Sequence, residues 1–235
     1  INGGFSQYTR LLYTLNVVTT DEAVIGWNDG NLHTMHKMTW DASNEFIAAT
    51  YYRIYTEIAY CNEFLRNVTD EKLGTNNITG DNLTQAKLMR AEARFLRAQS
   101  YFHALDMFGN VPFVTEAYSP AVTTPPSRIE RKDLFKYIET ELLAIADELK
   151  DPRTNEYGRA DKAAAWALLA RLYLNAEVYT GTQRNTDCIT YCNKVIGAGY
   201  SLKPKYEDLF LADNNISNSE QILSVNFDGI NTQTN

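Results

Sequence analysis

The pattern of apolar and polar positions is clearest over residues 83–108, where apolar side chains recur every three or four residues. These are Leu88, Ala91, Phe95, Ala98, Phe102 and Leu105. Such spacing places them along one face of an α-helix that packs through a heptad-like seam. Gly109 follows the last of them and Pro112 prevents continuation. The pattern therefore predicts a long helix that ends at about residue 108.

Similar spacing predicts further helices at residues 5–16, 41–67, 132–150, 160–179 and 187–197. The segment 160–179 is apolar on nearly every side, which is typical of a helix at the centre of a core. Residues 69–82 are polar and predict a connection, whereas residues 110–130 hold four of the six prolines and predict a long irregular segment. Residues 222–227 alternate between apolar and polar, which predicts a strand.

An internal repeat suggests how these helices are arranged. Residues 93–101 align with residues 165–173 at a spacing of 72 residues, with Ala98 matched to Ala170 and Tyr101 matched to Tyr173. Two helical hairpins of the tetratricopeptide type span about 68 residues, and small residues at matched positions allow helices to approach closely. We therefore predict a mainly all-α fold, a tetratricopeptide-like array of helical hairpins with long loops and little β-structure.

Composition and charge exclude several classes of function. The net charge of −7 and the pI near 5.0 argue against a nucleic-acid partner bound through its phosphates. No apolar run is long enough for a membrane-spanning helix. The chain opens with Ile1 and without a basic, then apolar leader, so we expect that any targeting segment is missing from it. Tyrosine supplies 15 of the 28 aromatic residues, and it suits both helix packing and wet binding surfaces.

No group of residues has the pattern of a catalytic or metal centre. His33 and His36, with Asp29 nearby, lack the further ligand that a metal site needs, and we expect solvated histidines. Cys188 and Cys192 have no second pair, so we expect buried free thiols, as for Cys61. The acidic pairs Glu139 with Glu141 and Asp147 with Glu148 are expected on solvated helix faces. We accordingly predict no catalytic residues, no metal and no cofactor.

Three segments, in this order along the chain, carry a resemblance to a known family. The first is 19–22 with Trp40 and Asp41, the second is 90–102 with 108–113, and the third is 158–165 with 169–174. Together they resemble the SusD-like (RagB/SusD) outer-membrane lipoproteins of Bacteroidetes. Members are about twice this length and begin at a lipidated cysteine. The resemblance thus implies that residues 1–235 are the N-terminal part of a single SusD-like α-helical domain, without its C-terminal half and its lipid anchor.

The resemblance implies a non-enzymatic protein that binds carbohydrate at the cell surface. Members of the family capture oligosaccharides or polysaccharides and pass them to a TonB-dependent transporter of the SusC type, as part of polysaccharide utilisation and nutrient uptake. Two alternatives stay open from the residues alone. One is a tetratricopeptide scaffold that binds peptides or proteins, and the other is an all-α glycosidase, which needs two carboxylates about 5–10 Å apart.

The candidate glycan site is the loop Trp27, Asn28 and Asp29. Gly26 and Gly30 bracket these residues, so turn chemistry keeps the tryptophan off any amphipathic helix face. One interpretation is an indole folded back onto a helix, since tryptophan is highly buried on average. The other is an indole face that stacks on a sugar ring, with the two polar side chains bonded to hydroxyl groups. Trp40, beside the next helix, is assigned to packing.

Overall fold

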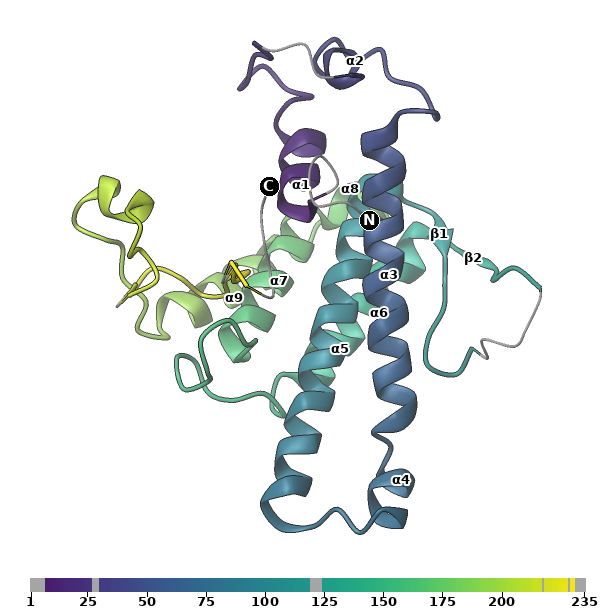
Figure 1. Cartoon of the computed structure of the whole chain (residues 1–235), viewed down its shortest axis with the longest axis vertical. Helices are drawn as coiled ribbons and strands as arrows, with labels where there is room; N and C mark the ends of the chain where they lie inside the picture. Colours follow the sequence, from purple (N-terminus) through teal and green to yellow (C-terminus); the bar gives the residue numbers. More distant parts are fainter. Residues whose placement is uncertain (1–6, 27–29, 119–123, 217, 228, 231–235) are drawn as a thin grey trace. The chain divides into compact units, whose positions relative to one another are not determined.

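The structure is a computed structural model, and it describes residues 7–26, 30–118, 124–216, 218–227 and 229–230. Two compact units make up the chain, and Figure 1 labels their helices and strands in chain order. The first contains residues 1–57 together with 226–235, and the second contains residues 58–225. The described residues are mainly helical, which confirms the predicted fold class.

The first unit holds α1 (Tyr8–Asn16), α2 (Leu32–His36) and the start of α3 (Glu45–Asn67). Its core is a cluster of five buried apolar side chains, with Ile25 and three other half-buried residues packed on it. The five are Leu11, Val18, Leu32, Met35 and Phe46. The short helix α2 was not predicted, because five residues are too few to establish a helical period.

The second unit contains the end of α3 and the remaining helices. These are α4 (Asp70–Thr75), α5 (Gly80–Phe108), α6 (Arg131–Ile145), α7 (Lys162–Leu174), α8 (Ala176–Thr180), α9 (Asn185–Ile196) and the 3₁₀-helix η1 (Tyr206–Phe210). Two short strands, β1 (Val111–Pro112) and β2 (Arg128–Ile129), pair antiparallel with Val111 opposite Ile129. They close the irregular segment into a loop.

Packing within this unit pairs the helices as hairpins: α5 lies against α6, and α7 lies against α9. The matched positions of the internal repeat are buried in both hairpins. Ala98 is fully buried and Ala170 is 9% exposed, while Tyr101 and Tyr173 are 0% and 2% exposed. The burial of α7 on most of its sides confirms its predicted central place, with Ala163, Ala165, Leu169 and Leu172 fully buried.

Several predicted boundaries were wrong. The strand expected at residues 222–227 does not form among these described residues, because an alternating segment without a partner strand gains no ladder hydrogen bonds. The helix expected over 160–179 is broken at Asn175, which ends α7 and precedes α8. The connection expected at 69–82 contains α4, whose first turn is capped by the Thr69 side chain. The helix expected over 132–150 ends at Ile145.

Candidate functional site

The predicted glycan loop, Trp27 to Asp29, lies outside the described residues. The residues on either side of it are described, however, and both ends are held in the first unit. Ile25 packs on the apolar cluster before the loop, and Leu32 and Met35 belong to that cluster after it. The loop is therefore a short connection between two anchored ends.

Polar contacts fix the exit of the loop to the start of α3. Asn44 is 2% exposed; its amide nitrogen donates to Thr34 Oγ1 at 3.1 Å, and its Oδ1 accepts from the backbone N–H of Phe46 at 2.9 Å. Asn31 donates from its side chain to the Glu45 carboxylate. This bond lowers the pKa of Glu45 and keeps the carboxylate charged beside the loop.

Gly30 directly follows the loop. Its backbone conformation explains why a glycine occupies this position. Its φ is +49°, in the left-handed region, and a Cβ there would lie 2.8 Å from Glu45 Oε1. Any side chain would be strained by this φ and would require the Glu45 carboxylate to move. Glycine at this position thus preserves the frame of the loop.

Trp40 lies in the next connection along the chain, between α2 and α3. Its side chain is 41% exposed, so its assignment to packing was wrong. The residue precedes Asp41, whose carboxylate accepts from the backbone N–H of Ser43 at 2.8 Å. Trp40 therefore lies before this turn, outside the apolar face of α3 that begins with Phe46.

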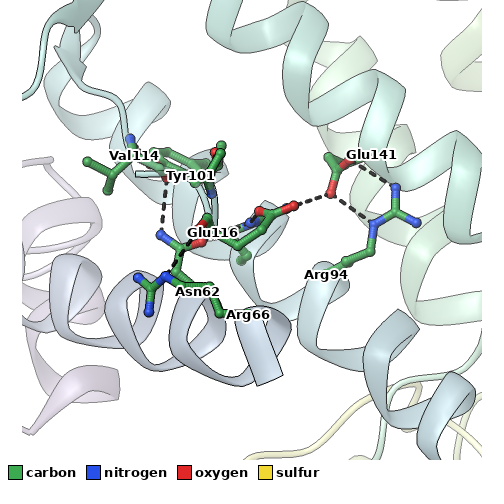
Figure 2. A network of polar contacts seen from close by, with 10 residues as sticks. Asn62, Arg66, Arg94, Tyr101, Val114, Glu116 and Glu141 are labelled. Atoms are coloured by element: carbon green, nitrogen blue, oxygen red, sulfur yellow. Dashed lines mark hydrogen bonds and ion pairs between the residues drawn. The ribbon is translucent and has the colours of Figure 1, made fainter. Parts of the chain in front are cut away.

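The irregular segment after β1 is held by a polar network in the second unit (Figure 2). Tyr101 donates its hydroxyl to the carbonyl of Val114 at 2.6 Å and accepts from the N–H of Val114 at 2.9 Å. From α3, Asn62 donates to the same carbonyl at 3.2 Å, and Arg66 donates from Nε to the carbonyl of Glu116 at 3.0 Å. Side chains of α3 and α5 thereby hold the backbone of the described residues that follow β1.

Arg97 is the centre of that network and is only 3% exposed. Its guanidinium donates to Asn62 Oδ1 at 2.8 Å, to Glu141 at 3.1 Å and to the Glu116 carboxylate. Arg94 adds two bonds to Glu141, at 3.1 and 2.9 Å. The buried guanidinium thus joins α3, α5, α6 and the irregular segment.

The acidic pair Glu139 and Glu141 was expected on a solvated face, and this was wrong. Both side chains are 15% exposed and paired with arginines. Burial alone would raise the pKa of Glu141, but Arg94 and Arg97 bring it below its usual range. A carboxylate held charged in this way cannot act as a general acid. Asp147 and Glu148 are exposed as predicted.

A second group of polar contacts between helices involves the residues just before α7. The guanidinium of Arg159 pairs with Glu92, with Nε 3.1 Å from Oε1 and Nη2 2.6 Å from Oε2. Asp161, 4% exposed, caps α7 by accepting from the N–H of Ala164 at 3.0 Å. The segments 90–102 and 158–165, which carried the family resemblance, therefore contain residues that connect helices to one another. The roles of these residues are structural.

The candidate metal ligands and thiols do not form a centre in the described residues. His33 and His36 lie on α2, while Asp29 falls outside the described part of the chain. Within that part, no three histidine, cysteine or acidic side chains lie together as metal ligands do. Cys61 is buried as predicted, but Cys192 is exposed and Cys188 half-buried. Nor is any described helix long and apolar enough to cross a membrane.

Comparisons with known proteins agree with this helical architecture. A family model described as "Starch-binding associating with outer membrane" matches residues 7–174. The starch-binding protein SusD of Bacteroides thetaiotaomicron is 36% identical over 236 residues, which cover 98% of this chain and 40% of that protein. The chain thus spans about two fifths of this relative's length.

Solved structures share the fold at lower identity. Surface glycan-binding protein A from Bacteroides uniformis superposes with a TM-score of 0.75 at 22% identity, over 92% of this chain and 47% of that one. A laminarin-binding SusD-like protein superposes with a TM-score of 0.76 at 24% identity, over 94% of this chain and 46% of that one. At these identities the likeness concerns the fold.

Proposed function

The chain belongs to the SusD-like family, whose members are carbohydrate-binding proteins and not enzymes, and from that premise we propose that it binds a glycan at the cell surface for nutrient uptake. The observation that carries the proposal is the 36% identity to a starch-binding protein along nearly the whole chain. The pairing of Glu139 and Glu141 with arginines is consistent with binding rather than hydrolysis.

We propose that the glycan is bound by Trp27, Asn28 and Asp29. The indole of Trp27 stacks on the apolar C–H face of a sugar ring, and the two polar side chains exchange hydrogen bonds with hydroxyl groups. The anchored ends of the loop support this assignment, because a fixed frame lowers the entropic cost of ordering a binding loop. Trp40, exposed in the following connection between α2 and α3, is a second aromatic ring open to contact.

Replacing Trp27 with alanine is expected to weaken glycan binding by roughly 5- to 150-fold, which corresponds to a stacking contribution of about 1–3 kcal/mol. The measurement is calorimetric titration of the 235-residue chain with starch, laminarin and xyloglucan oligosaccharides, using the one that binds wild type. Tyr60→Ala removes an aromatic ring that is 74% exposed on α3 and serves as the matched control, with unchanged affinity.

The opposite result would be equally clear. If Trp27→Ala keeps its affinity while its melting temperature falls, the indole is a core residue and the glycan site lies elsewhere. A variant that loses affinity with an unchanged melting temperature supports the stacking role.

We further propose that the protein delivers its glycan to a SusC-like, TonB-dependent transporter, and that an N-terminal lipid anchor holds it in the outer membrane. Membership of a family associated with the outer membrane supports both ideas. Affinity purification from membranes of the native host is expected to recover a large β-barrel transporter in stable ratio with the protein. Repeated recovery of the protein alone, with its lipid-modified form present, would contradict the proposed delivery.

A further inference from the structure

A pocket of about 270 Å³ lies in the second unit, between the loop that precedes α7 and the chain that follows α9. Tyr157 and Gly158 line it from the loop before α7, and Tyr200, Gln221 and Ser224 line it from the chain after α9. The hydroxyl of Tyr157 is 3.4 Å from Gln221 Oε1, so the two walls meet. The volume is just below the range of about 300–1,000 Å³ that is usual for ligand pockets, so it suits a small ligand.

The first wall is held in place by contacts with α5 and α7. Asn155 donates to Glu92 at 2.8 Å and to the carbonyl of Ala160 at 2.8 Å. The backbone N–H of Arg153 donates to the buried Asp161 carboxylate at 2.8 Å. These hydrogen bonds fix the loop that carries the exposed Tyr157.

The opposite wall is held by the residues after Tyr200. The N–H of Ser201 donates to the carbonyl of Ser219 at 3.1 Å, and Ser219 Oγ donates to the carbonyl of Ser201 at 2.9 Å. The N–H of Lys203 donates to the Glu220 carboxylate at 3.0 Å. These bonds bring Gln221 to the pocket from a segment distant in sequence, and both walls are thus preorganised.

Charge selects the class of ligand. Two arginines and two acids line the pocket, so their formal charges sum to zero, and each makes contacts within the protein. Arg159 pairs with Glu92 at 2.6 Å and with Glu156 at 3.5 Å. Asp161 accepts from backbone N–H groups and lies 3.4 Å from the Tyr200 hydroxyl. Arg153 donates to the carbonyl of Gly199 and lies over the Tyr200 ring. The balanced charges and these existing contacts favour a neutral ligand over an anion or a cation.

The remaining lining suits a neutral ligand rich in hydroxyl groups. Tyr157, 54% exposed, offers an aromatic face, and the side-chain amides of Gln221 and Asn215 can donate and accept hydrogen bonds. Aromatic faces beside amides match the alternating apolar and hydroxyl surfaces of a sugar. We infer that this pocket is an accessory binding site for a short neutral saccharide, separate from the Trp27 loop.

The test is to map binding by nuclear magnetic resonance on the isotope-labelled 235-residue chain carrying Trp27→Ala. Maltose, cellobiose and laminaribiose are the probes, added one at a time. At least one is expected to shift the amide signals of Tyr157 and Gly158 and the side-chain amide of Gln221 in a saturable way. Using the Trp27→Ala chain separates this site from the proposed loop site, because binding here does not need the indole.

Variants decide whether the pocket itself is responsible. Tyr157→Ala combined with Gln221→Ala is expected to weaken the effect about tenfold or more, while Tyr60→Ala leaves it unchanged. Both replaced residues are exposed, and signal dispersion elsewhere in the spectrum reports that the variant is folded. Absence of saturable shifts at the pocket with all three sugars, or shifts that persist in the double variant, would overturn the inference.

Discussion

Replacing Arg97 with methionine is expected to lower the free energy of unfolding by about 3 kcal/mol. The change leaves Asn62 Oδ1 without its charged donor and removes one partner from each of Glu116 and Glu141. Loss of one member of a buried ion pair costs about 3–5 kcal/mol. For Arg97→Met we expect the lower end of this range. Glu141 remains paired with Arg94, and the Glu116 side chain is 43% exposed and therefore hydrated.

Urea unfolding followed by circular dichroism measures this loss. Arg128→Met is the matched control, since Arg128 is 66% exposed and its Glu130 contact is 3.8 Å long; its effect should stay within about 0.5 kcal/mol. Arg97→Lys is expected to fall between wild type and Arg97→Met, because an ammonium keeps the charge but cannot bridge three acceptors in one plane. Equal stability of Arg97→Met and Arg128→Met would show that the network does not hold the irregular segment.

Placing a charge inside α7 is expected to destabilise the second unit by about 3–5 kcal/mol. The variant is Ala170→Glu, at a position that is 9% exposed between fully buried Leu169 and Leu172. A carboxylate placed at this buried position loses most of its hydration, so it is either desolvated or protonated. Both outcomes reduce the free energy of unfolding.

The same urea titration measures this loss, and Ile189→Glu is its control. Ile189 is 60% exposed on α9, so the added charge stays in water and the stability changes by about 0.5 kcal/mol or less. If Ala170→Glu unfolds at the same urea concentration as wild type, α7 is not the central helix of the hairpin array.

Local pattern predicted the long helices because each buries a continuous apolar stripe. The seam from Leu88 to Leu105 placed α5 within three residues of its observed bounds, and the all-apolar run of α7 correctly indicated its burial. The ends of the helices were less predictable, because each end depends on a single capping residue. Asn175 ends α7, yet its neighbours on both sides continue the apolar pattern.

Polar partners could not be predicted, because they come from distant parts of the chain. Glu141 is 44 residues from Arg97 in sequence, and nothing local to α6 shows that an arginine approaches it. One signal was present: Arg97 and Tyr101 are spaced by four residues, each directly before a residue of the apolar seam, so both lie on one helix face beside it. The loop proposed for glycan binding was inferred from turn chemistry and family resemblance, and its three residues lie outside the described part of the chain.

The central claim is that this protein binds glycan without cleaving it. Its most direct test makes two measurements on the same sample. The protein is first titrated calorimetrically with starch, laminarin and xyloglucan oligosaccharides, and the reducing ends in the mixture are then measured after incubation. The account predicts saturable binding of at least one of these glycans with no increase in reducing ends. New reducing ends with any of them, or no saturable binding with all of them, would contradict it.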